Sequence, residues 1–264
     1  MGDMADISEQ SRNRPVCVGY SEIDKYAIKV YERNFKGHKN YGDATTIIAS
    51  ELPDFDLLVG GFPCQAFSIA GKRRGFDDTR GTLFFDIARI LSEKRPRHLV
   101  LENVKGLLSH DGGKTFQTII GVLTDLGYVV EWQVLNSKDF GVPQNRERVF
   151  IVGHLGGEPR RKVFPIFGAN TKNLEQLVGG HQGNRVYSTG GVSSTLASQA
   201  GGMGAKTGLY ATPRIRRLTP LECERLQGFP DNWTVGSDTQ RYKQCGNAVT
   251  VNVVEAVMRG LYEA

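Results

Sequence analysis

Hydrophobic residues in the first half of the chain follow two alternating patterns. Short apolar runs bounded by glycine, proline or charged residues predict buried strands, at Val16–Tyr20, Leu57–Val59, Leu99–Leu101, Tyr128–Leu135 and Val149–Gly153. Between these runs, apolar residues recur every three or four positions, which predicts amphipathic helices from about Ile23, Leu83 and Phe116. Strands that alternate with helices favour an α/β fold with a parallel sheet and right-handed crossovers.

The pattern changes after His154. Periodicity fades there, and Gly, Ser and Thr dominate residues 179–208. Helical signals return with a capping box at Thr219–Glu222 and with the apolar positions from Val253 to Val257. We therefore predict a larger unit formed by residues 1–153 and 242–264, and a smaller, irregular unit formed by residues 154–241.

Composition narrows the class of protein. The 264 residues are enough for one large domain, or for one with a small companion. The chain shows neither an apolar run long enough to span a membrane nor a signal peptide, so we expect a cytoplasmic protein. Four cysteines lie far apart and five histidines form no cluster, which argues against bound metal and against a disulfide framework. A net charge of +5 favours an anionic partner.

Reactive side chains stand where three predicted strands begin or end. Cys64 stands in the turn that follows the strand at residues 57–59, Glu102 ends the next strand, and Arg146 and Arg148 precede a third. A free cysteine is usually a small buried hydrophobe, so Cys64 alone is an ambiguous signal. The charged residues at the other two strand ends favour a catalytic role for Cys64, because open α/β sheets bind ligands at the carboxyl ends of their strands.

Three motifs carry a resemblance to a known family. Phe62-Pro63-Cys64-Gln65, Glu102-Asn103-Val104 and Gln144-x-Arg146-x-Arg148 resemble the central motifs of the DNA (cytosine-5)-methyltransferases, in the family's order and spacing. The similarity covers nearly the whole chain, from about Val18 to Val254. It implies an α/β fold with an S-adenosylmethionine-dependent methyltransferase (Rossmann-like) sheet and a small irregular target-recognition domain.

The resemblance implies roles for the catalytic candidates. Cys64 would add as a thiolate to carbon 6 of a cytosine that is flipped out of the duplex. Glu102 would donate a proton to N3, and Arg148, supported by Arg146, would hold the carbonyl oxygen of the base. The base that removes the proton from carbon 5 is not assigned.

The resemblance also implies S-adenosylmethionine as cofactor. An acidic residue at the end of a strand is placed to bind ribose hydroxyls, although it could equally interact with a helix dipole. The positions matching the family's cofactor contacts are Glu22, Ile23, Asp43, Phe62, Leu83 and Asn247. The family's first strand and its Phe-x-Gly-x-Gly loop are not found in this sequence. We therefore expect the chain to begin near the second strand and to expose strand edges and apolar surface.

The expected macromolecular partner is double-stranded DNA, with a cognate restriction endonuclease as a possible second protein. A basic segment would close over the flipped base, and a later segment would contact the target. The candidates for DNA contact are Lys72, Arg73, Arg74, Gln182, Arg185 and Thr195. In the later segment, a solvated loop explains any single residue equally well. The target sequence and the oligomeric state stay open.

Alternative functions remain. A non-catalytic DNA-binding remnant would follow if the missing cofactor loop has abolished transfer. A tRNA cytosine-5 methyltransferase is disfavoured because Gln65-Ala66-Phe67-Ser68 resembles the bacterial DNA enzymes. A cysteine hydrolase is the least favoured, because no histidine stands in a matching position at a strand end.

Overall fold

The computed structural model describes residues 15–63, 83–157, 174–179, 185–197, 209–211 and 215–262. Five of the predicted site residues lie outside these ranges, namely Cys64, Lys72, Arg73, Arg74 and Gln182.

The main sheet has four strands in the order β1-β2-β4-β3. Their bounds are Leu57–Gly61 for β1, His98–Val104 for β2, Tyr128–Asn136 for β3 and Glu147–Leu155 for β4. β1 and β2 are parallel, as predicted, but β4 runs antiparallel to both of its neighbours. The prediction of a parallel sheet is therefore wrong for β4. Residues 137–146 hold only a short 3-10 turn and cannot form the crossover that a parallel connection needs.

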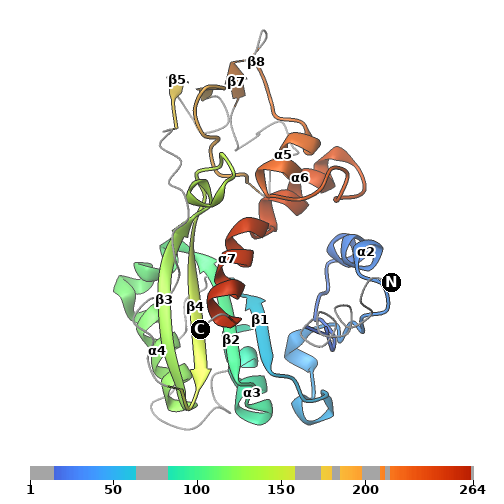
Figure 1. Cartoon of the computed structure of the whole chain (residues 1–264), viewed down its shortest axis with the longest axis vertical. Helices are drawn as coiled ribbons and strands as arrows, with labels where there is room; N and C mark the ends of the chain where they lie inside the picture. The colour runs from blue at the N-terminus through green and yellow to red at the C-terminus, as the bar shows by residue number, and fades with distance from the viewer. Residues whose placement is uncertain are drawn as a thin grey trace, which may run out of the picture.

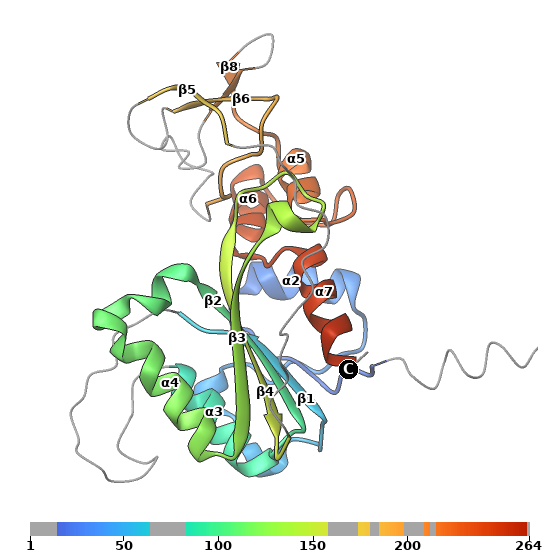
Figure 2. The same cartoon turned by 60° about the vertical axis from the view of Figure 1, so that its left-hand side comes forward.

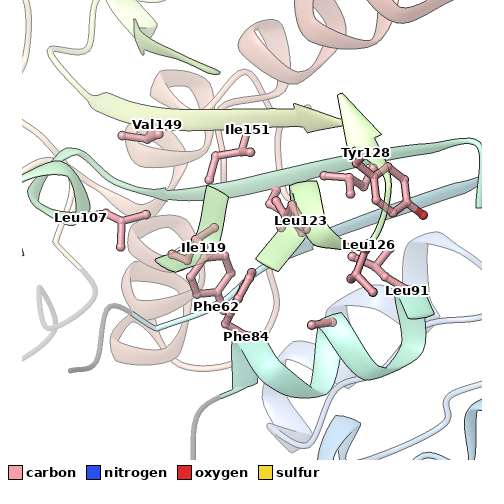
Figure 3. Packing of buried hydrophobic residues seen from close by; sticks show 13 residues of the cluster. Phe62, Phe84, Leu91, Leu107, Ile119, Leu123, Leu126, Tyr128, Val149 and Ile151 are labelled. Atoms are coloured by element: carbon pink, nitrogen blue, oxygen red, sulfur yellow. The ribbon is translucent and has the colours of Figure 1, made fainter. Parts of the chain in front are cut away.

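Helices cover both faces of this sheet (Figures 1 and 2). α3 (Leu83–Lys94) and α4 (Lys114–Asp125) pack on one face, and α7 (Val251–Tyr262) packs on the other. Successive strand residues point to opposite faces, so in β2 Leu99 and Leu101 join the α3–α4 core while Val100 joins the α7 core. Figure 3 shows the first of these cores around Phe62, Phe84, Leu123 and Ile151.

The predicted helices are confirmed, and one predicted strand is wrong. The first helix, α2 (Lys25–Asn34), begins at the N-cap Asp24, whose carboxylate accepts hydrogen bonds from two backbone amides. The segment Val16–Tyr20 forms no strand and makes only an isolated bridge between Tyr20 and Asn40. Val16 is 85% exposed, so its apolar side chain meets no core that would hold the segment in a sheet.

β1 is an edge strand of the described sheet. It pairs with β2 on one side, and no described strand pairs with its other side. Val59 in its middle is 62% exposed. The expected exposure of a strand edge and of apolar surface is thus confirmed for this part of the chain.

The smaller unit contains a second four-stranded sheet, in the order β5-β6-β7-β8, at the top of Figure 1. The strand bounds are Gln176–Val178 for β5, Val186–Ser188 for β6, Leu209–Ala211 for β7 and Ile215–Arg216 for β8. The helix α5 (Pro220–Leu226) follows, and α6 (Asp238–Asn247) runs across the predicted boundary at residue 241. The predicted capping box of Thr219 and Glu222 starts α5. α6 was not predicted because its polar sequence carries no apolar stripe.

The remaining short turns are 3-10 helices at Ala44–Thr46, Ala49–Glu51, Lys105–Leu108, His110–Gly113 and Ser137–Phe140. Within the ranges that the structure describes, no helix has the length and apolar character needed to cross a bilayer.

Candidate functional site

An ion pair joins the ends of two neighbouring strands. Nε of Arg148 on β4 lies 2.8 Å from Oε1 of Glu102 on β2, and both side chains are mostly buried. Arg148 is the register partner of Val104, so the pair is diagonal across the ladder. The even-numbered positions of both strands face α7, which places the pair on the α7 face of the sheet.

Burial governs the electrostatics of this pair. It raises the pKa of Glu102 above the ordinary value of 4.5, while the charges of Arg148 and Arg146 act in the opposite direction. Burial also lowers the pKa of Arg148, against the attraction of Glu102. A carboxyl with a raised pKa can carry a proton to a bound base, and the neighbouring guanidinium can neutralise negative charge there.

The segment that leads to Cys64 starts beside Glu102. Gly61, the last residue of β1, is the register partner of Glu102 and stands three positions before Cys64. A Cβ on Gly61 would lie 3.4 Å from Oε2 of Glu102. Asn103 then fixes the next residue, because its Nδ2 donates to the carbonyl oxygen of Phe62 over 2.8 Å. Asn103 belongs to the Glu102-Asn103-Val104 motif, but the sequence alone indicated no role for it.

The side chain of Arg146 is buried and hydrogen-bonds the backbone of other segments. It is 2% exposed, and its guanidinium donates to the carbonyl oxygens of Leu196, Gly246 and Ala248 over 3.1, 2.9 and 2.8 Å. Burial, with the nearby charge of Arg148, lowers the pKa of Arg146 to about 9. These contacts join the segment around Leu196 and the end of α6 to the residue that precedes β4.

Two buried glutamines extend this framework, and sequence reasoning missed both. Gln144 donates to the carbonyl oxygen of Leu226 and accepts from the amide of Leu196. Gln227 donates to the carbonyl oxygen of Cys245 and accepts from the hydroxyl of Thr250. The only sequence signal was the position of Gln144 within the Gln-x-Arg-x-Arg motif.

A cavity of about 380 Å³ lies between α2 and α6. This volume falls within the range of about 300–1,000 Å³ that is usual for small-molecule sites. Glu22 and Asn247, two of the predicted cofactor residues, both line it. Its walls also include Asp24, Tyr26, Trp233 and Lys243.

Glu22 is held in place by local hydrogen bonds. Its Oε1 accepts from the backbone amides of Ile23 and Asp24, each over 2.8 Å. The side chain of Asn40 accepts from its amide and donates to its carbonyl oxygen. Both of the hydrogen bonds from Ile23 and Asp24 use the same carboxylate oxygen. A carboxylate fixed at the rim of an apolar and aromatic cavity suits a ribose hydroxyl, so these residues fit S-adenosylmethionine.

The other predicted cofactor residues do not line this cavity. Ile23 is 71% exposed, and Asp43 accepts hydrogen bonds from the amide and hydroxyl of Thr45. Phe62 is buried in the α3–α4 core, and Leu83 packs against that core. The bridge between Tyr20 and Asn40 nevertheless brings the segments of Glu22 and Asp43 side by side.

Two predicted DNA contacts are described. The hydroxyl of Thr195 donates to the carbonyl oxygen of Asn145, which ties the smaller unit to the segment before β4. Arg185 precedes β6, and its carbonyl oxygen accepts from the amide of Leu209. In the part of the chain that the structure covers, no group of three or more His, Cys, Asp or Glu could hold a metal ion.

The α/β fold of this chain is shared with solved structures of low sequence identity. The chain is similar to the Entamoeba histolytica methyltransferase EhMeth, with a TM-score of 0.72 and 17% identity over 93% of this chain and 89% of that one. It is also similar to a mutant of the Spodoptera frugiperda protein DNMT2, with a TM-score of 0.70 and 19% identity over 97% and 95% of the two chains.

Sequence comparison gives the family. The family model of the C-5 cytosine-specific DNA methylases matches residues 9–195 and 169–263. The type II methyltransferase M.HhaI of Haemophilus parahaemolyticus is 41% identical over 91% of this chain and 86% of the relative. M.NgoBI of Neisseria gonorrhoeae is 42% identical over 90% of this chain and 84% of the relative. The chain belongs to the C-5 cytosine-specific DNA methylase family.

Proposed function

We propose that this chain transfers a methyl group from S-adenosylmethionine to carbon 5 of a flipped-out cytosine in a specific duplex DNA sequence. The observation that carries the proposal is the buried pair of Glu102 and Arg148, which lies beside the strand end that leads to Cys64. Membership of the C-5 cytosine-specific DNA methylase family supports it.

Carbon 5 of cytosine is a poor nucleophile, so the ring must first be activated. The thiolate of Cys64 forms a bond to carbon 6, and Glu102 gives a proton to N3 as the ring gains electron density. Arg148 holds the carbonyl oxygen of the base. Carbon 5 would then take the methyl group, whose bond to the sulfonium sulfur would break and leave a neutral thioether. A base would remove the proton from carbon 5, the bond from the Cys64 sulfur to carbon 6 would break, and the N3 proton would return to Glu102.

S-adenosylmethionine, when bound, supplies a methyl group on a positively charged sulfonium. Glu22 would accept hydrogen bonds from the ribose hydroxyls, and the segment around Asn247 would form the opposite wall of the cavity. Arg146 would keep that wall in place through the carbonyl oxygens on either side of Asn247. Ile23, Asp43, Phe62 and Leu83 are further candidate contacts whose support is the motif match alone.

The DNA side of the proposal rests on the smaller unit and on the basic segment after Cys64. Residues 154–241 would form the target-recognition domain, with the catalytic domain made of residues 1–153 and 242–264. Contacts to DNA would come from Lys72, Arg73, Arg74, Gln182, Arg185 and Thr195. Duplex DNA is the proposed partner, a cytoplasmic location is the proposed setting, and a cognate restriction endonuclease would complete a restriction-modification pair.

Covalent trapping tests this function. Fluorine at carbon 5 cannot leave as a proton does, so a duplex that carries 5-fluorocytosine at target sites should stay bound to Cys64 after methyl transfer. We expect a denaturation-resistant complex that needs S-adenosylmethionine and that Cys64→Ala abolishes. A folded protein that retains DNA but forms no such complex would contradict the proposal.

A DNA-binding remnant without transfer is the second candidate. The specific observation in its favour is the edge of β1, which no described strand covers and which exposes Val59. In this second reading, an uncovered strand edge would destabilise the main sheet and so weaken cofactor binding. Calorimetric titration with S-adenosylmethionine separates the two functions, because the remnant would bind DNA and no cofactor.

A further inference from the structure

One ion pair joins the two helices that border the cavity. Nζ of Lys243 on α6 lies 2.7 Å from Oδ2 of Asp24, the N-cap of α2. Both residues line the cavity. Figure 1 shows α2 standing beside α6 and apart from the main sheet. The pair is therefore a direct link between the two walls of the cavity.

The two carboxylate oxygens of Asp24 accept hydrogen bonds from different groups. Oδ1 accepts from the backbone amides of Tyr26 and Ala27 and so starts α2. Oδ2 accepts from Lys243. The hydrogen bond from Lys243 is the largest influence that lowers the pKa of Asp24, and the amide of Tyr26 adds to it. The helix start and the link across the cavity can therefore be separated by mutation.

Both ends of the link are close to the proposed cofactor contacts. Glu22 stands two positions before Asp24, and its Oε1 accepts from the backbone amide of Asp24. Lys243 stands four positions before Asn247 on α6, which puts the two on the same side of the helix. Moving Lys243 relative to Asp24 would change the distance between Glu22 and Asn247.

Other contacts between these walls are of a different kind. Phe35, the C-cap of α2, packs edge-on against Trp233, with ring centroids 5.8 Å apart, and Nδ2 of Asn34 donates to the carbonyl oxygen of Trp233 over 3.4 Å. These contacts lie at the C-terminal end of α2. The ion pair acts at the N-terminal end, where Glu22 is.

We propose that the Asp24–Lys243 ion pair is a positioning device that sets the width of the cofactor cavity and so the affinity for S-adenosylmethionine. The inference rests on the proposed function. Neither side chain needs to touch the reacting atoms. Without the pair, the two walls must be ordered when the cofactor binds, and that cost appears as weaker binding.

The test compares Lys243→Met and Asp24→Asn with the unchanged chain. Asp24→Asn keeps an oxygen that can cap α2 while removing the charge that binds Lys243. We expect the Kd and the KM for S-adenosylmethionine to rise about fivefold in each variant, with kcat at saturating cofactor and KM for DNA unchanged. The double variant should be no weaker than either single one, because the pair acts as a unit.

Lys94→Met is the matched control. Lys94 binds Asp54 over the same 2.7 Å, and neither residue lines the cavity. We expect this variant to keep the cofactor Kd of the unchanged chain. Lys243→Arg, which retains the charge, should restore most of the affinity lost in Lys243→Met. A general loss of stability would lower the melting temperature of both Lys243→Met and Lys94→Met. It would not raise the KM for S-adenosylmethionine while leaving kcat unchanged.

The outcomes distinguish this inference from the proposed function. If the unchanged chain binds cofactor and transfers methyl groups while Lys243→Met keeps the same Kd, the positioning role is overturned and the function stands. If the unchanged chain binds no S-adenosylmethionine, both are overturned. Equal losses of kcat and of affinity in Lys243→Met would also contradict a positioning role.

Discussion

Arg148 and Glu102 face each other across the β2–β4 ladder at 2.8 Å, in a setting where burial outweighs their attraction for both pKa values. The pKa of Glu102 stands above 4.5 although a guanidinium touches it. A group with a raised pKa stabilises the fold below its unfolded pKa and loses that contribution as pH rises through the folded value.

Removal of Arg148 should raise the pKa of Glu102 further. The charge and the hydrogen bond of Arg148 both lower that pKa, so Arg148→Met leaves burial less opposed. Carboxyl-carbon NMR titration of Glu102 measures the shift. Lys105→Met, which removes an exposed ion pair with Glu147, is the control and should move the titration much less. A lower pKa in Arg148→Met would contradict the account.

Arg146 and Arg148 should respond differently to lysine. Arg146→Lys cannot reach the three carbonyl oxygens of Leu196, Gly246 and Ala248 at once, and unsatisfied buried groups cost about 1–3 kcal/mol each. We expect its free energy of unfolding to fall by about 2 kcal/mol or more, measured by urea denaturation. Arg148→Lys should lose mainly kcat, by about a hundredfold. The reverse assignment of these losses would show that Arg146 is the residue that acts on the base.

Glu222 gives a prediction for acid. The hydrogen bond from Arg216 is the main cause that lowers the pKa of Glu222 to about 2, and burial opposes it. Because the folded pKa is depressed, the stabilisation is present above the ordinary value of 4.5 and is lost as pH falls towards about 2.

The variant Glu222→Gln tests this directly, since glutamine can keep the capping box with Thr219. The variant should be less stable than the unchanged chain at pH 6, by less than about 1 kcal/mol for a pair that is partly exposed. Denaturation curves between pH 3 and pH 6 should show the difference shrinking as pH falls. A constant difference across that range would rule out the charge as its cause.

The antiparallel register of β2 and β4 predicts a steric conflict. Gly153 is the register partner of Leu99, and a Cβ on Gly153 would lie 2.8 Å from Cγ of Leu99. Gly153→Ala should therefore cost about 1–3 kcal/mol of stability. In a double-mutant cycle with Leu99→Ala, the two losses should sum to more than the loss in the double variant. Strict additivity would argue against this register.

Periodicity predicted the four strands of the main sheet and the helices α2, α3, α4 and α7, but it wrongly predicted a strand at Val16–Tyr20. Periodicity could not predict that β4 lies between β2 and β3 and runs antiparallel to both. The order and direction of strands depend on their connections and on which strands pair. The sequence did not predict α6, because its residues are mostly polar and its helix is stabilised by tertiary packing around Cys245.

For the site, the motifs predicted which residues matter better than how they contact one another. The strand-end positions of Glu102 and Arg148 placed both residues in one candidate site, and the two side chains form an ion pair. The hydrogen bond from Arg146 to Ala248 joins two residues that are 102 positions apart in the sequence. The ion pair of Asp24 and Lys243 joins two that are 219 positions apart. No local pattern encodes such contacts, which arise only when the chain is folded.

The most direct test of the central claim is transfer of labelled methyl groups from S-adenosylmethionine to unmethylated duplex DNA. The account predicts label at carbon 5 of cytosine, transfer that Cys64→Ala abolishes, and a rate that Glu102→Gln lowers by about a hundredfold or more. Folded protein that binds DNA and cofactor but transfers no label, or transfer that survives Cys64→Ala, would contradict it.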